Sequence, residues 1–289
     1  MEANVFTQVL LPLALAFIMF GMGLSLQGAD FARVFLNPKA AAVGLVCQMA
    51  LLPLCAYLLT LAWPLSPALA MGVLILAACP GGPTSNLVSY LARGDVALSV
   101  TLTAVNSMIA FVTAPILINF FLQSVMDEGQ VVQLPLVRTI VQIFGLTVVP
   151  VLIGMAVRGR FPSLASAAER PLRVLSMLFI VIVVAGAVLQ VREQLPEFFR
   201  QAGLATGTLN VLTMLLGYGA ARAVALDRRQ SATISIEVGI QNGTMAIFIA
   251  TTLLKQPEMS IAPAIYSLIM FATGGWMIYW FGRRLPARQ

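Results

Sequence analysis

The sequence has no histidine, only three cysteines and few charges: charged residues make up 10% of its 289 residues, against 60% hydrophobic residues. Without histidine, the commonest proton shuttle and metal ligand is missing. The odd number of cysteines (Cys47, Cys55 and Cys79) in apolar surroundings gives no disulfide framework. The composition therefore excludes a soluble domain and predicts an all-α polytopic membrane protein.

The sequence also lacks the residue patterns of several enzyme classes. A Ser-His pair is impossible, and Gly81-Gly82 is not followed by the Lys-Ser/Thr of a phosphate-binding loop. The net charge of +6 is explained by basic residues held on the cytoplasmic side of a membrane. We therefore expect neither an aqueous enzyme nor a nucleic-acid-binding protein.

Nine apolar segments are long enough to cross a bilayer as helices and form a single transmembrane domain. The first begins near Val5 without the basic region of a signal peptide, so we expect no cleaved leader. An odd number of crossings places the two chain ends on opposite sides. The segments cover residues 5–26, 40–61, 68–92, 96–122, 134–156, 174–190, 203–224, 231–254 and 261–281.

The basic residues indicate the orientation, because cytoplasmic loops are enriched in Lys and Arg. If the C-terminus is inside, only Arg138, Arg192, Arg200 and Lys255 of the 17 basic residues lie near the outer side. We therefore expect a multi-pass protein of the cell membrane with its N-terminus outside. The predicted inner residues are Arg33, Lys39, Arg93, Arg158, Arg160, Arg170, Arg173, Arg222, Arg228, Arg229, Arg283, Arg284 and Arg288.

Glu237 is the only one of 11 acidic residues that lies deep inside an apolar segment. A charge at the centre of a bilayer costs roughly 3 kcal/mol or more, so such residues usually face the bundle interior or a cavity and mark a functional site. We therefore expect Glu237 to lie among cations, water or polar partners.

Two predicted segments contain residues that break helices. Segment 68–92 contains Cys79-Pro80-Gly81-Gly82-Pro83, and segment 231–254 contains Gly239 and Gly243 around Gln241-Asn242. The predicted topology gives the two segments opposite courses, and one more spanning helix follows each. This pattern predicts an inverted repeat, segments one to four matching six to nine, with two discontinuous helices that cross at a binding site near the midplane.

Oxygen-bearing side chains surround both breaks. Carboxylate, amide, hydroxyl and carbonyl oxygens are ligands of hard cations such as Na⁺. Ser99 and Thr103 are spaced to share one helix face. We expect one sodium site made of Ser85, Asn86, Ser99, Thr103 and Glu237, and a second that includes Gln48, Gln241 and carbonyls freed near Val238 and Ile240.

The breaks also predict where a solute binds. Pro83 is suited to the start of a new half-helix, because no N–H is needed there, so the N–H groups of Thr84 and the next residues would point toward the midplane. Asn242 and Gly243 would approach from the other broken helix. Helix N-termini favour anions, so we expect a carboxylate-bearing solute.

Three further motifs make the sequence similar to the bile acid:sodium symporter family. Cys79-Pro80-Gly81-Gly82-x-x-Ser85-Asn86, Gly94-Asp95-x-x-Leu98-Ser99-Val100-x-x-Thr103 and Glu237-Val238-Gly239-x-Gln241-Asn242 resemble its signatures, as does Phe20-Gly21-Met22-Gly23-Leu24. The resemblance covers essentially the whole chain.

This resemblance implies a nine-helix form with two domains. Segments 5–26, 134–156 and 174–190 would form a panel, and segments 40–61, 68–92, 96–122, 203–224, 231–254 and 261–281 a core. It also implies two sodium ions with Glu237 as a ligand of both. Where some bacterial relatives have a His-Asn pair facing the cavity, this chain has Met270-Phe271, and it has Pro83 where relatives often have Thr or Ser.

The predicted function is Na⁺-coupled symport of an organic anion, by alternating access. The cargo is bile-acid-like or a small carboxylate such as pantoate or a keto-acid. Two alternatives stay open: a proton-coupled or efflux carrier resembling the arsenite permeases, with Cys79 as a metalloid ligand, and an intramembrane enzyme that uses Glu237. The anion, the Na⁺ stoichiometry and the oligomeric state do not follow from the sequence.

Overall fold

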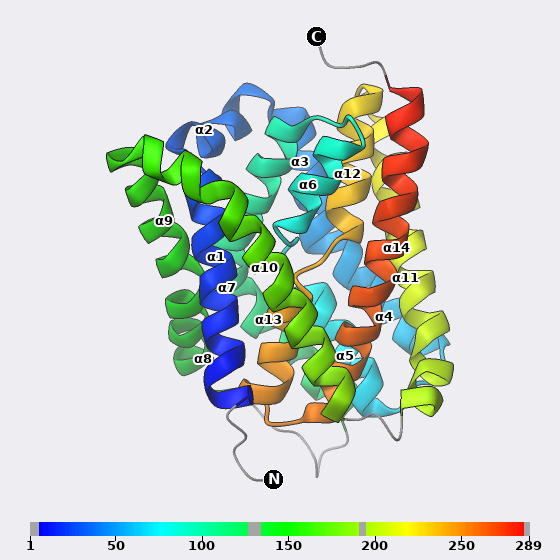
Figure 1. Ribbon diagram of the computed structural model, residues 1–289. Helices are drawn as coiled ribbons and strands as arrows, with labels where there is room; N and C mark the ends of the chain where they lie inside the picture. The colour runs from blue at the N-terminus through cyan, green and yellow to red at the C-terminus, as the bar shows by residue number, and fades with distance from the viewer. Residues whose placement is uncertain (1–5, 127–133, 191–194, 286–289) are drawn as a thin grey trace.

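The computed structural model describes residues 6–126, 134–190 and 195–285, and they form a bundle of helices (Figure 1). Within these ranges no β-strand occurs, apart from one isolated antiparallel bridge between Gly81 and Gln241. Val5, Arg192 and Arg288, which entered the predicted topology, lie outside the described residues. The first described helix starts at one end of the bundle and the last helix ends at the other (Figure 1).

The N-terminal half of the bundle comprises helices interrupted by short π-helical turns. In order, these elements are η1 (Phe6–Leu10), α1 (Leu11–Ser25), α2 (Gly28–Leu36), α3 (Pro38–Val46), η2 (Cys47–Leu51), α4 (Leu52–Ala62), α5 (Pro67–Ala78), α6 (Thr84–Leu91) and α7 (Val96–Val125).

The C-terminal half continues in the same manner. Its elements are α8 (Leu136–Ile143), η3 (Phe144–Val148), α9 (Val149–Arg160), α10 (Pro162–Gln190), α11 (Leu195–Ala223), α12 (Arg228–Gly239), α13 (Gly243–Phe248), η4 (Ile249–Leu253), the 3₁₀ turn η5 (Pro257–Ser260) and α14 (Ile261–Arg284).

Proline explains where three of the π-helical turns lie. A proline ring clashes with the carbonyl four residues earlier and has no N–H to donate to it. Pro12, Pro53 and Pro150 each follow a turn, η1, η2 and η3 respectively, that contains this carbonyl. The widened turn accommodates the proline without ending the helix. In η2 the same turn carries Gln48.

Six helical stretches of the described chain are long and apolar enough to cross a membrane, and three shorter apolar helices accompany them. The protein is therefore a polytopic helical membrane protein, as predicted, while the count of nine crossings stays a prediction. The six are Gln8–Ser25, Pro38–Ala62, Val96–Val125, Leu136–Arg160, Phe199–Ala223 and Pro257–Arg284; the shorter ones are Pro67–Ala78, Val174–Gly186 and Gly243–Leu253.

The helix bounds differ from the sequence prediction in three places. Helix α10 begins at Pro162 instead of residue 174, and α11 begins at Leu195 instead of 203. The prediction followed only the apolar stretches, whereas the helices continue through the polar residues that precede these stretches. Helix α2, which was not predicted, lies across one end of the bundle (Figure 1). Its start is capped by the carboxylate of Asp30, which accepts a hydrogen bond from the Gln27 N–H at 2.7 Å.

Glycines bring α1 and α9 into direct backbone contact. A Cβ on Gly23 would clash with the Val151 carbonyl, and a Cβ on Gly154 with the Phe20 carbonyl. Small residues at such helix interfaces are typical of membrane proteins, because close packing replaces the missing hydrophobic driving force. This contact gives a structural reason for the Phe20–Leu24 motif.

Candidate functional site

Two helices are broken in the middle of the bundle, and the breaks lie where the sequence predicted them. Helix α5 ends at Ala78 and α6 begins at Thr84, whereas α12 ends at Gly239 and α13 begins at Gly243. The unwound segments pair with each other: the Gly82 N–H donates to the Ile240 carbonyl at 3.2 Å, and the Asn242 N–H to the Pro80 carbonyl at 3.0 Å. Backbone groups released from the helices are thereby satisfied inside protein, as a lipid environment requires.

Asn210 and Tyr266 also stabilise the break, although neither was among the residues predicted for the site. The Asn210 amide donates to the Gly239 carbonyl at 2.8 Å, and the Tyr266 hydroxyl donates to the same oxygen at 2.9 Å. This carbonyl is the acceptor left over where α12 ends. Asn210 and Tyr266 are fully buried, and their polar groups within apolar helices were the available signal.

The side chain of Glu237 lies at this crossing and is surrounded by hydroxyl groups. Its Oε2 accepts hydrogen bonds from Ser85 at 2.7 Å and Ser99 at 3.1 Å, and its Oε1 accepts one from Thr103 at 2.5 Å. Asn86 Oδ1 accepts from Ser99 at 2.9 Å and from Thr103 at 3.2 Å. The five residues predicted for the first sodium site therefore lie together, drawn from α6, α7 and α12.

Acceptor oxygens outnumber protons in this cluster. Ser85, Ser99 and Thr103 each have one hydroxyl proton to donate. They face the two carboxylate oxygens of Glu237, Asn86 Oδ1 and the carbonyls of Gly82 and Ser99. Glu237, Ser85, Ser99 and Thr103 have no solvent exposure. A buried anionic cluster with surplus lone pairs is suited to holding a hard cation.

The second predicted cluster is also assembled at the crossing. Gln48 Nε2 donates to Gln241 Oε1 at 2.7 Å, and Gln241 Nε2 donates to Gln48 Oε1 at 3.2 Å and to the Val238 carbonyl at 2.7 Å. In the structure the carbonyls of Val238 and Ile240, which were expected to be released from the helix, each accept another hydrogen bond. The Gln241 side chain donates to the Val238 carbonyl three residues earlier, and the Gly82 N–H donates to the Ile240 carbonyl where the two unwound segments pair.

The four residues predicted to meet the solute line one cavity beside the crossing. Pro83 and Thr84 lie at the start of α6, and Asn242 and Gly243 at the start of α13. Asn242 Oδ1 caps α13 by accepting from the Met245 N–H at 3.0 Å, while its Nδ2 has no protein partner. The remaining lining residues are Ile18, Gly82, Gln241, Thr244, Ser267 and Met270.

Two discontinuous helices whose breaks meet beside a buried carboxylate are typical of membrane transport proteins. Comparison with known proteins agrees with this class. The model of the Sodium Bile acid symporter family matches residues 12–198. The chain belongs to this family, so the resemblance inferred from its motifs is confirmed, and it is a sodium-coupled transporter and not an enzyme.

Similar proteins occur in bacteria, plants and animals. The "Uncharacterized sodium-dependent transporter YocS" of Bacillus subtilis (strain 168) is 30% identical over 95% of this chain and 84% of its own length. The "Probable sodium/metabolite cotransporter BASS2, chloroplastic" of Oryza sativa subsp. japonica is 28% identical over 100% and 67%. The human "Ileal sodium/bile acid cotransporter" is 28% identical over 93% and 77%.

Proposed function

We propose that the protein is a secondary transporter of the cell membrane that uses inward Na⁺ movement to take up an organic anion by alternating access. The surplus of acceptor oxygens around Glu237 is the observation that carries this proposal. One Na⁺ would be bound by Ser85, Asn86, Ser99, Thr103 and Glu237. A second would be bound by Gln48, Glu237, Gln241 and the carbonyls of Val238 and Ile240.

The second site requires a rearrangement of side chains. In the structure Gln48 and Gln241 hydrogen-bond to each other, so their oxygens face one another's amide groups. Rotation of the two amides would direct both oxygens to one ion, next to the Val238 carbonyl. Ion binding would then order the start of α13, where Asn242 follows Gln241 directly. Through these contacts, Na⁺ binding would raise the affinity of the cavity for the anion. Because such coupling is reciprocal, anion binding would raise the affinity for Na⁺ by the same factor.

The anion would bind between the starts of α6 and α13. Helix N-termini attract negative charge, and Asn242 Nδ2 adds a donor without a protein partner in the same cavity. Met270 makes one wall apolar, while the neighbouring Phe271 is 43% exposed and does not line the cavity. The site therefore favours a carboxylate with an apolar body, in the class of bile acids, pantoate or keto-acids.

The arrangement of the helices supports a panel and a core. Helix α1 packs mainly on α9 and α10, whereas α11 packs on α12 and α14, and α5 on α7. We assign α1, α8–α9 and α10 to the panel and the other long helices to the core. The broken pairs α5–α6 and α12–α13 run in opposite directions and each precedes one long helix, α7 or α14 (Figure 1). This arrangement supports our proposal of an inverted repeat in a nine-crossing protein whose N-terminus lies outside.

Sodium binding is tested first with Glu237→Gln. Na⁺ that binds the folded state alone raises its thermal stability, and K⁺ or choline serves as the reference ion. We expect Glu237→Gln to weaken Na⁺ binding at least about a hundredfold, because the cage loses its only charge. Glu258→Gln, which removes an exposed carboxylate in η5, is the matched control. If Na⁺ stabilises Glu237→Gln as much as it stabilises the wild type, Glu237 is not a sodium ligand.

The anion is tested in the same assay. Bile acids, pantoate, ketopantoate and small keto-acids are screened with Na⁺ and with K⁺. We expect a thermal shift that needs both Na⁺ and the correct anion, followed by Na⁺-dependent uptake of that anion into proteoliposomes. Uptake that is unchanged when K⁺ replaces Na⁺ would refute sodium coupling.

A further inference from the structure

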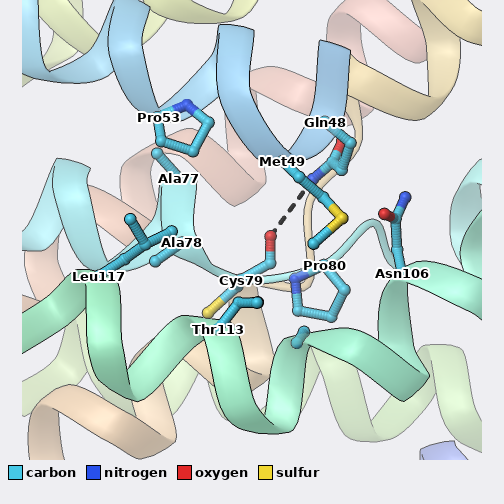
Figure 2. Close-up of a pocket in the computed structure, with 11 residues that line it drawn as sticks. Gln48, Met49, Pro53, Ala77, Ala78, Cys79, Pro80, Asn106, Thr113 and Leu117 are labelled. Atoms are coloured by element: carbon cyan, nitrogen blue, oxygen red, sulfur yellow. Dashed lines mark hydrogen bonds between the residues drawn. The ribbon is translucent and has the colours of Figure 1, made fainter. Parts of the chain in front are cut away.

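A second cavity opens onto the crossing and shares no lining residue with the anion cavity. Figure 2 shows it between the helices that carry Gln48 and Asn106 and the unwound segment that carries Cys79 and Pro80. The residues at its floor, Gln48, Cys79, Pro80 and Asn106, are buried, while Met49, Thr113 and Leu117 at its rim are partly exposed. The cavity and the open space at its mouth together amount to about 270 Å³, most of which is not enclosed by protein.

Asn106 is the residue that distinguishes this cavity from a packing defect. Its side chain rises from α7 on the side that faces Gln48, Met49 and Pro80 (Figure 2). Asn106 is 2% exposed, and neither its Nδ2 nor its Oδ1 has a hydrogen-bond partner in the protein. A buried amide without partners is strongly unfavourable, whereas in a polar cavity water or an ion satisfies it. The cavity is therefore built for a hydrated occupant.

One face of α7, which carries mostly polar residues, connects this cavity with the Glu237 cluster. Ser99, Thr103, Asn106, Ala110 and Thr113 follow one another at spacings of three or four residues, so they share one helix face. The first two donate to Glu237, and the last three line the cavity. One continuous face thus leads from the rim of the cavity to the buried carboxylate.

The floor of the cavity is formed by a proposed sodium ligand. Gln48 lines the cavity and donates to the Cys79 carbonyl at 3.3 Å (Figure 2). Gln48 also donates to Gln241 Oε1 at 2.7 Å. Among the described residues that line the cavity, none is charged. A cavity lined only by neutral oxygens can bind a hydrated monovalent cation weakly and let it pass. Tight binding of a divalent ion usually requires carboxylates.

We propose that this cavity is the vestibule through which hydrated Na⁺ reaches the Gln48–Gln241 site, with Asn106 Oδ1 as its ligand. The inference rests on the proposed sodium-coupled function. The cavity lies on the part of α7 that runs from the crossing toward Val125, in the half of the bundle that contains α5 (Figure 1). The distribution of basic residues assigns this half to the outer side, from which Na⁺ enters. Ions and the organic anion would therefore approach the crossing through separate cavities.

The test measures the rate of Na⁺ binding without any substrate. Proteoliposomes on a solid-supported membrane receive a jump in Na⁺ concentration, and the charge displaced by Na⁺ binding is recorded. We expect Asn106→Leu, which keeps the size but removes both polar atoms, to slow this displacement about tenfold. Asn106→Asp adds a negative charge to the vestibule and should make displacement faster than in the wild type.

Ser107→Ala is the matched control, because Ser107 is the next residue on α7, has a buried hydroxyl without a partner and does not line the cavity. It should behave as the wild type. If both Asn106→Leu and Asn106→Asp bind Na⁺ at the wild-type rate, the vestibule proposal is refuted. It is also refuted if Ser107→Ala slows the charge displacement as much as Asn106→Leu does. If Asn106→Leu does not fold, the test rests on Asn106→Asp: faster displacement than in the wild type supports the proposal, and an unchanged rate refutes it. A wild-type protein without any Na⁺-induced displacement would instead overturn the proposed function.

Discussion

A single methyl group added at Gly81 should displace the Glu237 carboxylate without changing any charge. A Cβ at Gly81 would lie 2.7 Å from Glu237 Oε1 and 3.3 Å from its carboxyl carbon. Ordinary contact begins at 3.4 Å, so Oε1 must move by about 0.7 Å. Thr103 donates a hydrogen bond to this oxygen at 2.5 Å, and the Gly81 backbone is fixed by its bridge to Gln241.

The magnitude follows from the interaction that is lost. A hydrogen bond to a charged group contributes about 1.5–3 kcal/mol, and displacement of Oε1 removes the one from Thr103. The same displacement takes one carboxylate oxygen out of the proposed cation cage. We therefore expect Gly81→Ala to weaken Na⁺ binding by about 10- to 100-fold while leaving the fold intact.

The measurement is a Na⁺ titration of thermal stability in purified protein, with K⁺ as the reference ion. Gly275→Ala is the control, because a Cβ at Gly275 meets no atom within 4 Å. It should titrate as the wild type. If Gly81→Ala also titrates as the wild type, the carboxylate either has free space or is not a sodium ligand, and the reasoning from this contact is refuted.

Two further predictions concern backbone geometry. Tyr266→Phe removes one of two donors to the Gly239 carbonyl, so it should lower the free energy of unfolding by about 1 kcal/mol and weaken Na⁺ binding, measured by thermal melts with and without Na⁺. If the variant keeps the wild-type stability and Na⁺ affinity, the Asn210 amide alone satisfies the Gly239 carbonyl. Ala225 has a φ of 59°, a conformation that favours glycine, so Ala225→Gly should raise the stability by about 0.5–1 kcal/mol with unchanged Na⁺ dependence. A lower melting temperature would contradict this.

The positions of the helix breaks could be predicted because their cause is local. Proline removes a backbone donor and glycine lacks a side chain, so Pro80, Gly81 and Gly239 mark the breaks before any packing is known. Helix α2 and the early starts of α10 and α11 could not be read in this way. Their polar residues are compatible with both helix and loop, and their helical state depends on packing at the end of the bundle.

The members of the proposed sites were predictable as polar groups, but their partnerships were not. Asn106, Asn210 and Tyr266 have the same local pattern as many polar residues that only pack between helices. Burial and hydrogen bonding distinguish them: Asn210 and Tyr266 share one carbonyl, and Asn106 has no protein partner beside an open cavity. These properties arise from several helices at once.

The sequence alone thus determined the membrane class, the two helix breaks and the isolated carboxylate, since hydropathy and backbone chemistry act over a few neighbouring residues. Tertiary structure decided which oxygens meet. Ser99 and Glu237 are 138 residues apart and Gln48 and Gln241 are 193 apart, yet each pair is in hydrogen-bond contact. Only the crossing of two unwound helices, paired backbone to backbone, brings such distant residues into contact.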